Sequence, residues 1–370
     1  MHSAAEITNV VTRAAIEAGF ELAGIAPVED SPELEYFPVW IAEGHAGEMK
    51  YLEARDEEGR LKRASLANSA PWARSVVVCA INYNTAEPYS IDAQNHPSKN
   101  QQRGWISRYA WGQRDYHDSV MPRLLRVEAA LRRAVAADDL VTRCYVDTGP
   151  IVERVAAKYA GIGWIGKNTC IINQKIGSWM FLGVILTSLD LTPGLPAPDR
   201  CGTCTRCIDA CPTDAFIAPY QLDSNRCIAY LTIEKRGAIS QDKDKDKDKN
   251  EDLRSGIGRH IFGCDICQDV CPWNRKAPAT QAAEFQPREE LVNPELGWLA
   301  DIGAEEFRRT FKTSPLRRGK RAGIRRNAVI AMGNSGDRNF IPQLKTLATD
   351  DDEVVAESAI WAIQKLDSPD

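Results

Sequence analysis

The chain has 370 residues, of which 44% are hydrophobic and 26% are charged, and its formal net charge is -5 at pH 7. This composition is typical of a globular protein with room for two or three domains, and it excludes a chain that is disordered throughout. No hydrophobic stretch approaches the roughly 18 residues that a membrane-spanning helix needs, and the N-terminus lacks a signal-peptide pattern. We therefore expect a cytoplasmic protein with no membrane partner.

The N-terminal half shows the periodicities of alternating helices and strands. Hydrophobic residues at helical spacing between Ile7 and Ala18 predict a first helix, which Gly19 ends. A second helix is expected with Pro122 in its first turn. The predicted helices span 119–137 and 151–160, and the predicted strands span 22–25, 76–81, 141–146, 170–173 and 179–186. Prolines at 193, 196 and 198 then predict a linker that ends this α/β region.

A glycine-rich segment, Gly161–Gly166, matches the dinucleotide fingerprint by its letters. A nucleotide-binding loop follows a strand and opens a helix, whereas this segment follows a predicted helix and leads into a strand. We therefore predict that it is not a nicotinamide site, although its glycines allow the backbone to approach a flat cofactor closely.

Two polar residues of the α/β region have open roles. Asp147 follows a predicted strand and precedes Gly149 and Pro150, where a carboxylate either caps the next helix or serves as a catalytic group. His117, in Asp115-Tyr116-His117, could be a capping or core residue, a metal ligand, or a residue that contacts a ligand. The local sequence leaves these alternatives open.

Eight of the 11 cysteines lie between residues 201 and 271, in the order that two iron-sulfur clusters require. The first run is C-x-x-C-x-x-C-x-x-x-C-P, in which the fourth cysteine binds the neighbouring cluster. The second run is looser and also ends in Cys-Pro. The predicted ligands of cluster 1 are Cys201, Cys204, Cys207 and Cys271, and those of cluster 2 are Cys211, Cys227, Cys264 and Cys267.

A pair of zinc sites is the alternative for these cysteines, because two C-x-x-C knuckles can hold zinc. The further cysteine after each knuckle and the two Cys-Pro endings favour 4Fe-4S clusters. Cys79, Cys144 and Cys170 lie in hydrophobic surroundings and are expected to be core residues.

The C-terminal part contains a basic segment and a weak repeat. Residues 307–326 include no acid and many lysines and arginines, which predicts either a phosphate-binding surface or a solvated helix face. Ala328–Met332 is echoed by Ala359–Ile363, which suggests stacked helical pairs of the HEAT type. Alternating aspartate and lysine over 242–249 predict a solvated insertion without a role.

Several ordered motifs together resemble the epoxyqueuosine reductase family over almost the whole chain. The motifs are Asp147–Pro150, Gly163–Asn168, the first cysteine run, Cys227–Glu234, Phe262–Cys267 and Arg325–Ala328. The resemblance implies an α+β protein with a cobalamin-binding, nitroreductase-like α/β domain (1–195), a ferredoxin-like domain with two 4Fe-4S clusters (196–285), and a basic segment with a HEAT-like helical domain (286–370).

The resemblance also implies an activity. Members of this family use cobalamin, charged with electrons by the clusters, to reduce the epoxide of epoxyqueuosine to queuosine in a tRNA anticodon loop, the last step of queuosine biosynthesis. An external low-potential donor such as flavodoxin or ferredoxin and a monomeric enzyme are expected with it.

The resemblance assigns roles to individual residues. Asp147 is expected to be the general acid, with a pKa raised by burial beside the corrin. The expected cobalamin contacts are Arg63, Ser107, Tyr109, His117, Asp147, Lys167, Asn168 and Ser178. The expected tRNA contacts are Arg317, Arg318, Lys320, Arg321, Arg325 and Arg326.

Two other functions share these features. A corrinoid reductive dehalogenase would carry similar cofactors, but such enzymes typically have a twin-arginine leader, which we do not expect here, and have no need of a basic helical tail. A non-catalytic electron carrier would need little beyond its clusters, and the large upstream region disfavours it.

Overall fold

The computed structural model describes residues 3–94, 102–239 and 252–368. The predicted solvated insertion over 242–249 lies outside these residues. A four-stranded antiparallel sheet with the order β1-β2-β7-β4 organises the N-terminal unit. Its strands are β1 (Leu22–Pro27), β2 (Ser75–Asn82), β7 (Met180–Thr187) and β4 (Thr142–Tyr145).

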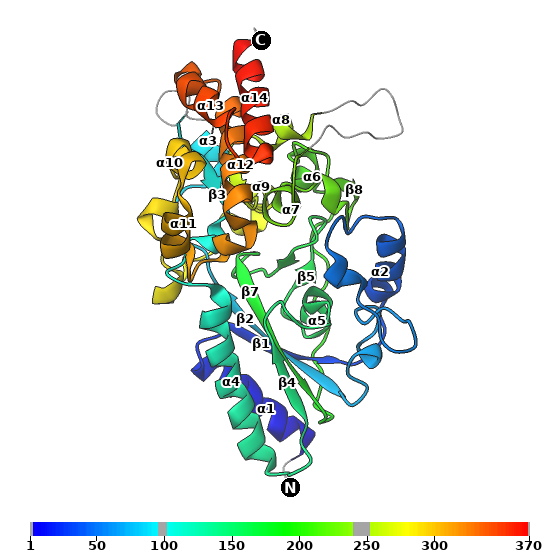
Figure 1. Ribbon diagram of the computed structural model, residues 1–370. Coiled ribbons are helices and arrows are strands. Elements are labelled where there is room, and N and C mark those ends of the chain that lie inside the picture. Colours follow the sequence, from blue (N-terminus) through cyan, green and yellow to red (C-terminus); the bar gives the residue numbers. More distant parts are fainter. Residues whose placement is uncertain (1–2, 95–101, 240–251, 369–370) are drawn as a thin grey trace.

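Helices cover both faces of this sheet (Figure 1). On one face, α1 (Ala4–Glu17) and α4 (Tyr116–Val135) share a core with Val77, Cys79 and Ile81 of β2. On the other face, α5 (Glu153–Tyr159) shares a core with the alternate β2 residues Val76, Val78 and Ala80. Because successive strand residues point to opposite faces and both faces are covered, β2 is buried along its length and its residues 76–81 are all hydrophobic.

The predicted elements of this unit are confirmed to within a few residues, with one error. Helix α4 begins at Tyr116, so Pro122 lies inside it and not in its first turn. The reason is the cap: the Asp115 carboxylate accepts a hydrogen bond from the backbone N–H of His117 at 3.1 Å, which starts the helix earlier than the hydrophobic pattern indicates.

The cysteine region consists of short elements beside the sheet. They are α6 (Arg206–Asp209), β8 (Phe216–Ala218), β9 (Gln221–Leu222), α7 (Ile228–Ile233), α8 (Leu253–Ile257) and α9 (Ile266–Asp269). Helix α2 (Pro32–Ala42) fastens the N-terminal unit to it, since Trp40 Nε1 donates to the carbonyl oxygen of Leu222 at 2.7 Å. The glycine-rich segment follows α5 and contains β5 (Trp164–Ile165), which pairs with β6 (Ile171–Ile172), so it does not open a helix as a dinucleotide-binding loop would.

The chain crosses between units before α4. After α3 (Ser90–Gln94), strand β3 (Trp105–Ile106) pairs in parallel with β10 (His260–Phe262). Trp105, Ile106 and Trp111 thereby belong to the core of the C-terminal helices. One segment of the region predicted as 1–195, from Trp105 to Trp111, therefore packs in the C-terminal part of the molecule.

The C-terminal region is helical and lies at the opposite end of the molecule from α1 (Figure 1). Its helices are α10 (Leu296–Asp301), α11 (Ala304–Phe311), α12 (Lys320–Asn334), α13 (Ile341–Leu347) and α14 (Glu353–Asp367). The two repeated segments fall in α12 and α14, which pack closely: a Cβ added at Gly333 would lie 2.9 Å from the Cα of Ala362. This close approach leaves no room for a larger residue at Gly333.

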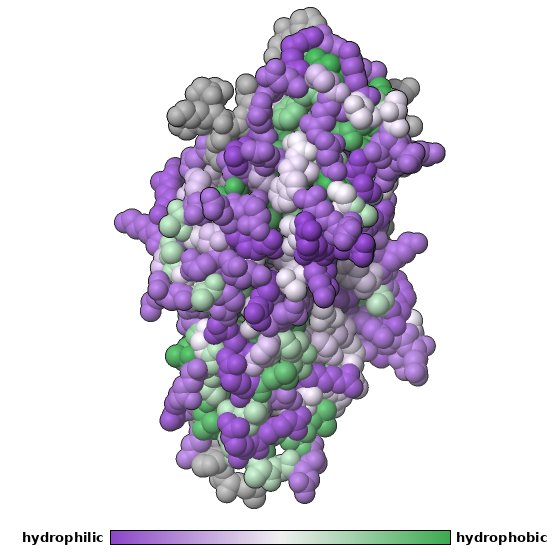
Figure 2. Space-filling model, turned by 60° about the vertical axis from the view of Figure 1, so that its left-hand side comes forward, coloured by the Kyte–Doolittle hydropathy of each residue, from purple (hydrophilic) through white to green (hydrophobic). Residues whose placement is uncertain are grey.

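On the face in Figure 2, hydrophilic residues cover most of the surface, and small hydrophobic areas appear both near the top and in the lower part. Among the described residues, no helix has the length and hydrophobicity that crossing a membrane requires.

Candidate cofactor and active site

Cysteines of the first run gather with one cysteine of the second. Burial, followed by the charges of Cys271, Cys201 and Cys204, raises the pKa of Cys207 to about 11. Burial likewise raises the pKa of Cys271 to about 11, with Cys201 and Cys204 again among the charges that act on it. These interactions place Cys271 with Cys201, Cys204 and Cys207, the predicted set for cluster 1.

The other four cysteines form a second group. Burial raises the pKa of Cys264, and the charges of Cys227 and Cys211 add to the effect. A hydrogen bond with Cys170 is the largest of the effects that raise the pKa of Cys267. Burial and the charges of Cys264 and Cys227 also raise it. Cys271 thus lies near cysteines of the first run, and Cys211 lies near Cys264 of the second run, an arrangement that suits two four-thiolate clusters. In the described parts of the chain, no three His, Cys, Asp or Glu side chains are placed to hold a single metal ion.

Cys170 lies in a different environment from the one predicted. Cys79 is fully buried in β2 and Cys144 is partly buried in β4, as expected of core residues. The Cys170 thiol instead forms a hydrogen bond with Cys267, which lowers the pKa of Cys170 against the opposing effect of burial. No spacing motif includes Cys170, so only the fold could reveal that it lies beside the second group.

Asp147 lies in the loop between β4 and α5, with its side chain exposed. Its φ of 57° is in the left-handed region, which costs a non-glycine residue free energy and needs support from neighbours. Two contacts supply it: the Asp147 N–H donates to Glu153 Oε1 at 2.7 Å, and the Tyr116 hydroxyl donates to Asp147 Oδ2 at 3.0 Å. The expected burial of Asp147 is not provided by the protein itself, so the carboxyl group is open to whatever binds here.

Glu153 is a functional candidate that sequence reasoning missed. Burial, followed by the charge of Asp147, raises the pKa of Glu153 from 4.5 to about 8, while the Asp147 N–H and the charges of Arg154 and Arg63 oppose the shift. Near neutral pH the side chain is therefore largely a neutral acid that accepts the Asp147 N–H. In sequence, Glu153 looks like an ordinary acid in the first turn of a helix, so no pattern marks it as a functional residue.

Glu153→Gln is expected to change how stability depends on pH. The native protein keeps a proton on Glu153 that the unfolded chain releases, so stability falls as pH rises from about 4.5 to about 8 and is level above that. Glutamine cannot titrate, so at pH 8.5 the variant should be more stable than the native protein by on the order of 2 kcal/mol, with little difference near pH 5. Thermal unfolding at both pH values measures this, with Glu58→Gln, at an exposed glutamate, as control. Parallel stability curves for the native protein and Glu153→Gln would contradict the assignment.

Tyr116 stands at the centre of an aromatic and charged cluster. Its ring stacks on Phe181 with centroids 4.4 Å apart, and the Arg318 guanidinium lies 5.2 Å from its centroid. Arg318 Nη2 donates to both carboxylate oxygens of Asp115, at 3.0 and 2.9 Å. Burial would raise the pKa of Asp115, but the hydrogen bond from His117 and the charge of Arg318 outweigh it and lower the pKa to about 2. The Asp115–Arg318 ion pair thus joins the N-terminal and C-terminal regions beside Asp147.

Three of the predicted cobalamin contacts lie around the Asp147 loop. Arg63 Nη2 donates to the carbonyl oxygen of Gly149 at 2.9 Å, so Arg63 holds the loop. The Tyr109 ring packs edge-on against Tyr116 at 6.0 Å, and burial raises the Tyr109 pKa. The ring of His117 lies 4.2 Å from that of Tyr116.

The other four lie along the cysteine region. The buried Ser107 hydroxyl donates to Asp265, and Asn168 Nδ2 donates to the carbonyl oxygen of Cys267 at 3.3 Å. The Ser178 hydroxyl oxygen accepts hydrogen bonds from Gln268 and Asn274 at 2.9 Å each, and Lys167 Nζ donates to the carbonyl oxygen of Gly202 at 2.7 Å. The structure therefore places the predicted contacts in two sets, one at Asp147 and one beside the cysteines.

Unsatisfied buried groups at this junction suit a bound polar cofactor. His117 Nε2 and Arg318 Nη1 are buried and, among the described residues, have no hydrogen-bond partner. Such groups are costly unless a ligand or water satisfies them. With the tyrosine rings of residues 109 and 116 beside them, these atoms fit a large macrocycle that presents polar edges.

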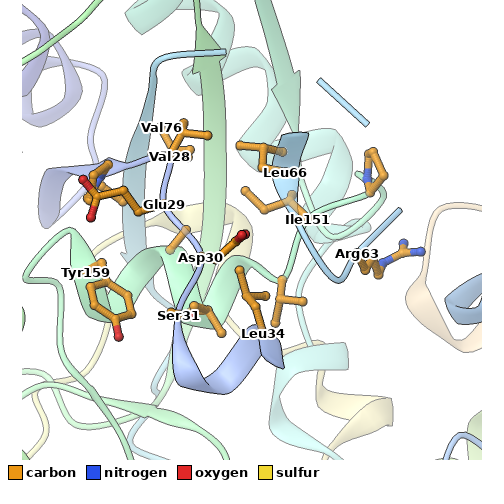
Figure 3. A pocket seen from close by; sticks show the side chains of 16 residues that line it. Val28, Glu29, Asp30, Ser31, Leu34, Arg63, Leu66, Val76, Ile151 and Tyr159 are labelled. Atoms are coloured by element: carbon orange, nitrogen blue, oxygen red, sulfur yellow. The ribbon is translucent and has the colours of Figure 1, made fainter. Parts of the chain in front are cut away.

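A cavity lies beside the C-terminal end of the loop that holds Asp147 (Figure 3). Pro150, Ile151 and Val152 of this loop line it, together with Leu34, Leu66, Arg63 and residues 26–31 at the end of β1 and in the β1–α2 connection. Hydrogen bonds from Arg63, Ser69 and Tyr116, and one to Glu153, hold the loop.

The structure divides the predicted tRNA contacts. Arg317 and Lys320 are exposed, whereas Arg321 is partly buried and donates to the carbonyl oxygen of Ile302 at 2.8 Å. The prediction is wrong for Arg325 and Arg326, whose exposed fractions are 4% and 1%.

Internal partners explain this burial. Arg325 pairs with Asp350, with Nη2 and Oδ2 2.5 Å apart, and Arg326 Nη2 donates to the carbonyl oxygen of Leu231 at 2.6 Å. Both guanidinium groups therefore tie α12 to its neighbours and are not available to phosphates.

The comparisons with known proteins first define a class. Residues 200–274 match the family model described as a 4Fe-4S double cluster binding domain. The chain is therefore an iron-sulfur protein whose second cysteine run belongs to the same domain as the first.

The family follows from longer matches. Residues 63–148 match the model "Epoxyqueuosine reductase QueG, DUF1730". The epoxyqueuosine reductase of Xanthomonas campestris pv. campestris is 38% identical over 94% of this chain and 92% of its own, and that of Synechocystis sp. is 42% identical over 82% and 98%. The chain belongs to the epoxyqueuosine reductase family, a family of oxidoreductases.

Solved structures agree with this assignment. A crystal structure of an epoxyqueuosine reductase with an epoxyqueuosine-modified tRNA-Tyr stem loop matches with a TM-score of 0.84, at 30% identity, over 99% of this chain and 92% of the other. A Bacillus subtilis epoxyqueuosine reductase, solved with its catalytic aspartate loop swung out of the active site, matches with a TM-score of 0.82 at 30% identity, over the same shares.

Proposed function

We propose that this protein reduces the epoxide of epoxyqueuosine to queuosine in the anticodon loop of tRNA. The observation that carries the proposal is the likeness over almost the whole chain to an epoxyqueuosine reductase that holds a modified tRNA stem loop. Family membership favours this function over the dehalogenase alternative, since relatives of 38% and 42% identity are epoxyqueuosine reductases.

The proposal includes the cofactors and the finer architecture. The two cysteine groups would bind two 4Fe-4S clusters that pass single electrons from an external low-potential donor such as flavodoxin or ferredoxin. The N-terminal unit would be a nitroreductase-like cobalamin domain and the C-terminal helices a HEAT-like domain, in a monomeric cytoplasmic enzyme.

Cobalamin would bind between the two regions. Tyr109, His117 and Arg63 would hold it near Asp147, and Lys167, Asn168, Ser107 and Ser178 would shape the wall toward the cysteines. When bound, it would supply a metal centre that accepts electrons one at a time and delivers two to the substrate.

Asp147 would be the proton donor. Removal of the epoxide oxygen as water consumes two electrons and two protons, and an acid within hydrogen-bonding reach of that oxygen lowers the barrier to its departure. Tyr116 fixes Asp147 Oδ2, and among the described residues Oδ1 has no hydrogen-bond partner and is free to face the substrate. The bound cofactor and base would then exclude water from an aspartate that the protein alone leaves exposed.

The exposed part of the basic segment would contact RNA phosphates. Charge reversal at Arg317 and Lys320 is expected to weaken binding of the tRNA stem loop by about tenfold or more at 0.1 M salt, because each lost phosphate contact reduces counterion release. The slope of log affinity against log salt should become shallower by about two. Fluorescence anisotropy over a salt series measures both, with the exposed Arg338→Glu as control. An unchanged affinity would contradict RNA binding by this segment and would favour the alternative, a solvated helix face.

Genetic complementation tests the function. In a bacterial strain that lacks its own epoxyqueuosine reductase, expression of this protein should restore queuosine in tRNA, as measured by mass spectrometry of nucleosides. Continued accumulation of epoxyqueuosine with soluble, cluster-containing protein present would contradict the proposal.

A further inference from the structure

Two neighbouring arginines of the basic segment have opposite environments. Arg317 is exposed, as expected of a residue that meets RNA. The side chain of Arg318 is only 28% exposed and faces inward to Asp115, whose side chain is 3% exposed. Arg318 therefore already has an anionic partner inside the protein, and a phosphate would have to compete with it.

Arg318 contacts the site through the ring of Tyr116. Its guanidinium lies over that ring at 5.2 Å, while the Asp115 carboxylate fixes its Nη2. The same ring stacks on Phe181 nearly in parallel, at an interplanar angle of 4°. The guanidinium is thus held from two sides, by the ion pair through Nη2 and by its place over the ring, whereas a lysine ammonium is a point charge that cannot occupy both positions at once.

Tyr116 in turn contacts the loop that contains Asp147. Its hydroxyl donates to Asp147 Oδ2 at 3.0 Å. Asp147 has a left-handed φ of 57°, and among the described residues its hydrogen bonds are those with Tyr116 and Glu153, so its position depends on these two bonds. A displacement of the Tyr116 ring would remove one of these bonds.

We infer that Arg318 is a positioning residue that holds Tyr116, and through it Asp147, and is not a phosphate ligand. The inference corrects the expected role of Arg318 in RNA binding and rests on the proposed function of Asp147. It places a residue of the C-terminal region two contacts from the proposed proton donor, in the same segment as the exposed Arg317. Modest misplacement of a reacting group is known to cost large factors in rate.

The experiment compares Arg318→Gln with Arg317→Gln in the holoenzyme. Each variant loses one positive charge from the same short helix, η8 (Pro315–Gly319), so a purely electrostatic role in RNA binding predicts similar effects. The measurements are anisotropy with the epoxyqueuosine-modified tRNA stem loop and the single-turnover rate at saturating RNA. Arg338→Gln, at a surface ion pair with Asp367, controls for charge loss alone.

We expect Arg318→Gln to lower the saturated rate about tenfold or more while RNA affinity stays within about twofold of the native value. Arg317→Gln should instead lower the affinity. In combination with Tyr116→Phe, Arg318→Gln should add little further loss, because both changes break the same connection. If Arg318→Gln weakens RNA binding as Arg317→Gln does and leaves the saturated rate intact, the inference is wrong.

A second variant covers the case in which Arg318→Gln does not fold. Arg318→Lys keeps the charge that a phosphate would bind but loses the planar group that lies over the Tyr116 ring while Nη2 pairs with Asp115, so it should also lower the saturated rate and spare the affinity. A native rate in Arg318→Lys would overturn the inference. If the native holoenzyme itself leaves the epoxide intact, the proposed function has failed, which is a separate result from any difference among the Arg318 variants.

Discussion

Asp147→Asn is expected to lower the single-turnover rate of epoxide reduction by about 10²–10⁴-fold. Asparagine has the size of aspartate and can keep the contacts to Tyr116 and Glu153 through its side-chain oxygen and backbone N–H, but it has no acidic proton to give. Iron content and affinity for the tRNA stem loop should remain native. Rapid-quench measurement of queuosine formation by the reconstituted enzyme provides the rate.

The control for this change is Asp118→Asn, at an exposed acid on α4 that is not part of the site. This variant should react at the native rate. If Asp147→Asn also reacted at the native rate, another group would supply the proton, and the contacts of Asp147 with Tyr116 and Glu153 would have only a structural role.

Cys271→Ala is expected to remove one cluster and abolish reduction. Cys271 lies with Cys201, Cys204 and Cys207, so its loss should affect the cluster of the first run although it belongs to the second run. Reconstituted protein should keep the paramagnetic signal of one reduced 4Fe-4S cluster and lose the other, and its iron should fall from about eight per chain.

The reciprocal variants make this test specific. Cys211→Ala and Cys264→Ala should lose the same cluster as each other, and not the one that Cys271→Ala loses. Cys144→Ala changes a partly buried thiol in β4 outside both groups and should keep both clusters. Loss of the same cluster in Cys271→Ala and Cys264→Ala would show that each run serves its own cluster and would contradict the exchange.

Spacing made the cysteine groups predictable. The C-x-x-C-x-x-C-x-x-x-C-P pattern is local in sequence and encodes the exchange of ligands directly. The hydrophobic periodicities of β2 and α5 likewise gave these elements to within a few residues, because burial on both sides of the sheet leaves an uninterrupted hydrophobic strand.

Environments that depend on tertiary contacts were not predictable. Arg317, Arg318 and Arg326 look alike in sequence, yet one is exposed, one pairs with Asp115, and one is buried against the carbonyl oxygen of Leu231. Charge patterning measures only how many like charges occur in a segment, and it cannot tell which of them have internal partners.

The raised pKa of Glu153 could not be predicted either, because it also depends on tertiary contacts. The shift arises from burial and from a loop aspartate six positions earlier, which is not one of the i+3 or i+4 pairs that helical spacing brings together. Cys170 similarly meets Cys267 only because β5 and β6 pair and bring that loop to the cysteine region. The fold was needed to find both.

Conversion of epoxyqueuosine-modified tRNA by the purified holoenzyme, under anaerobic conditions with a low-potential reductant, is the most direct measurement. Nucleoside mass spectrometry should show epoxyqueuosine disappearing as an equal amount of queuosine forms, in native protein that contains both clusters and a corrinoid. An unchanged epoxyqueuosine signal in such fully loaded protein would contradict the account.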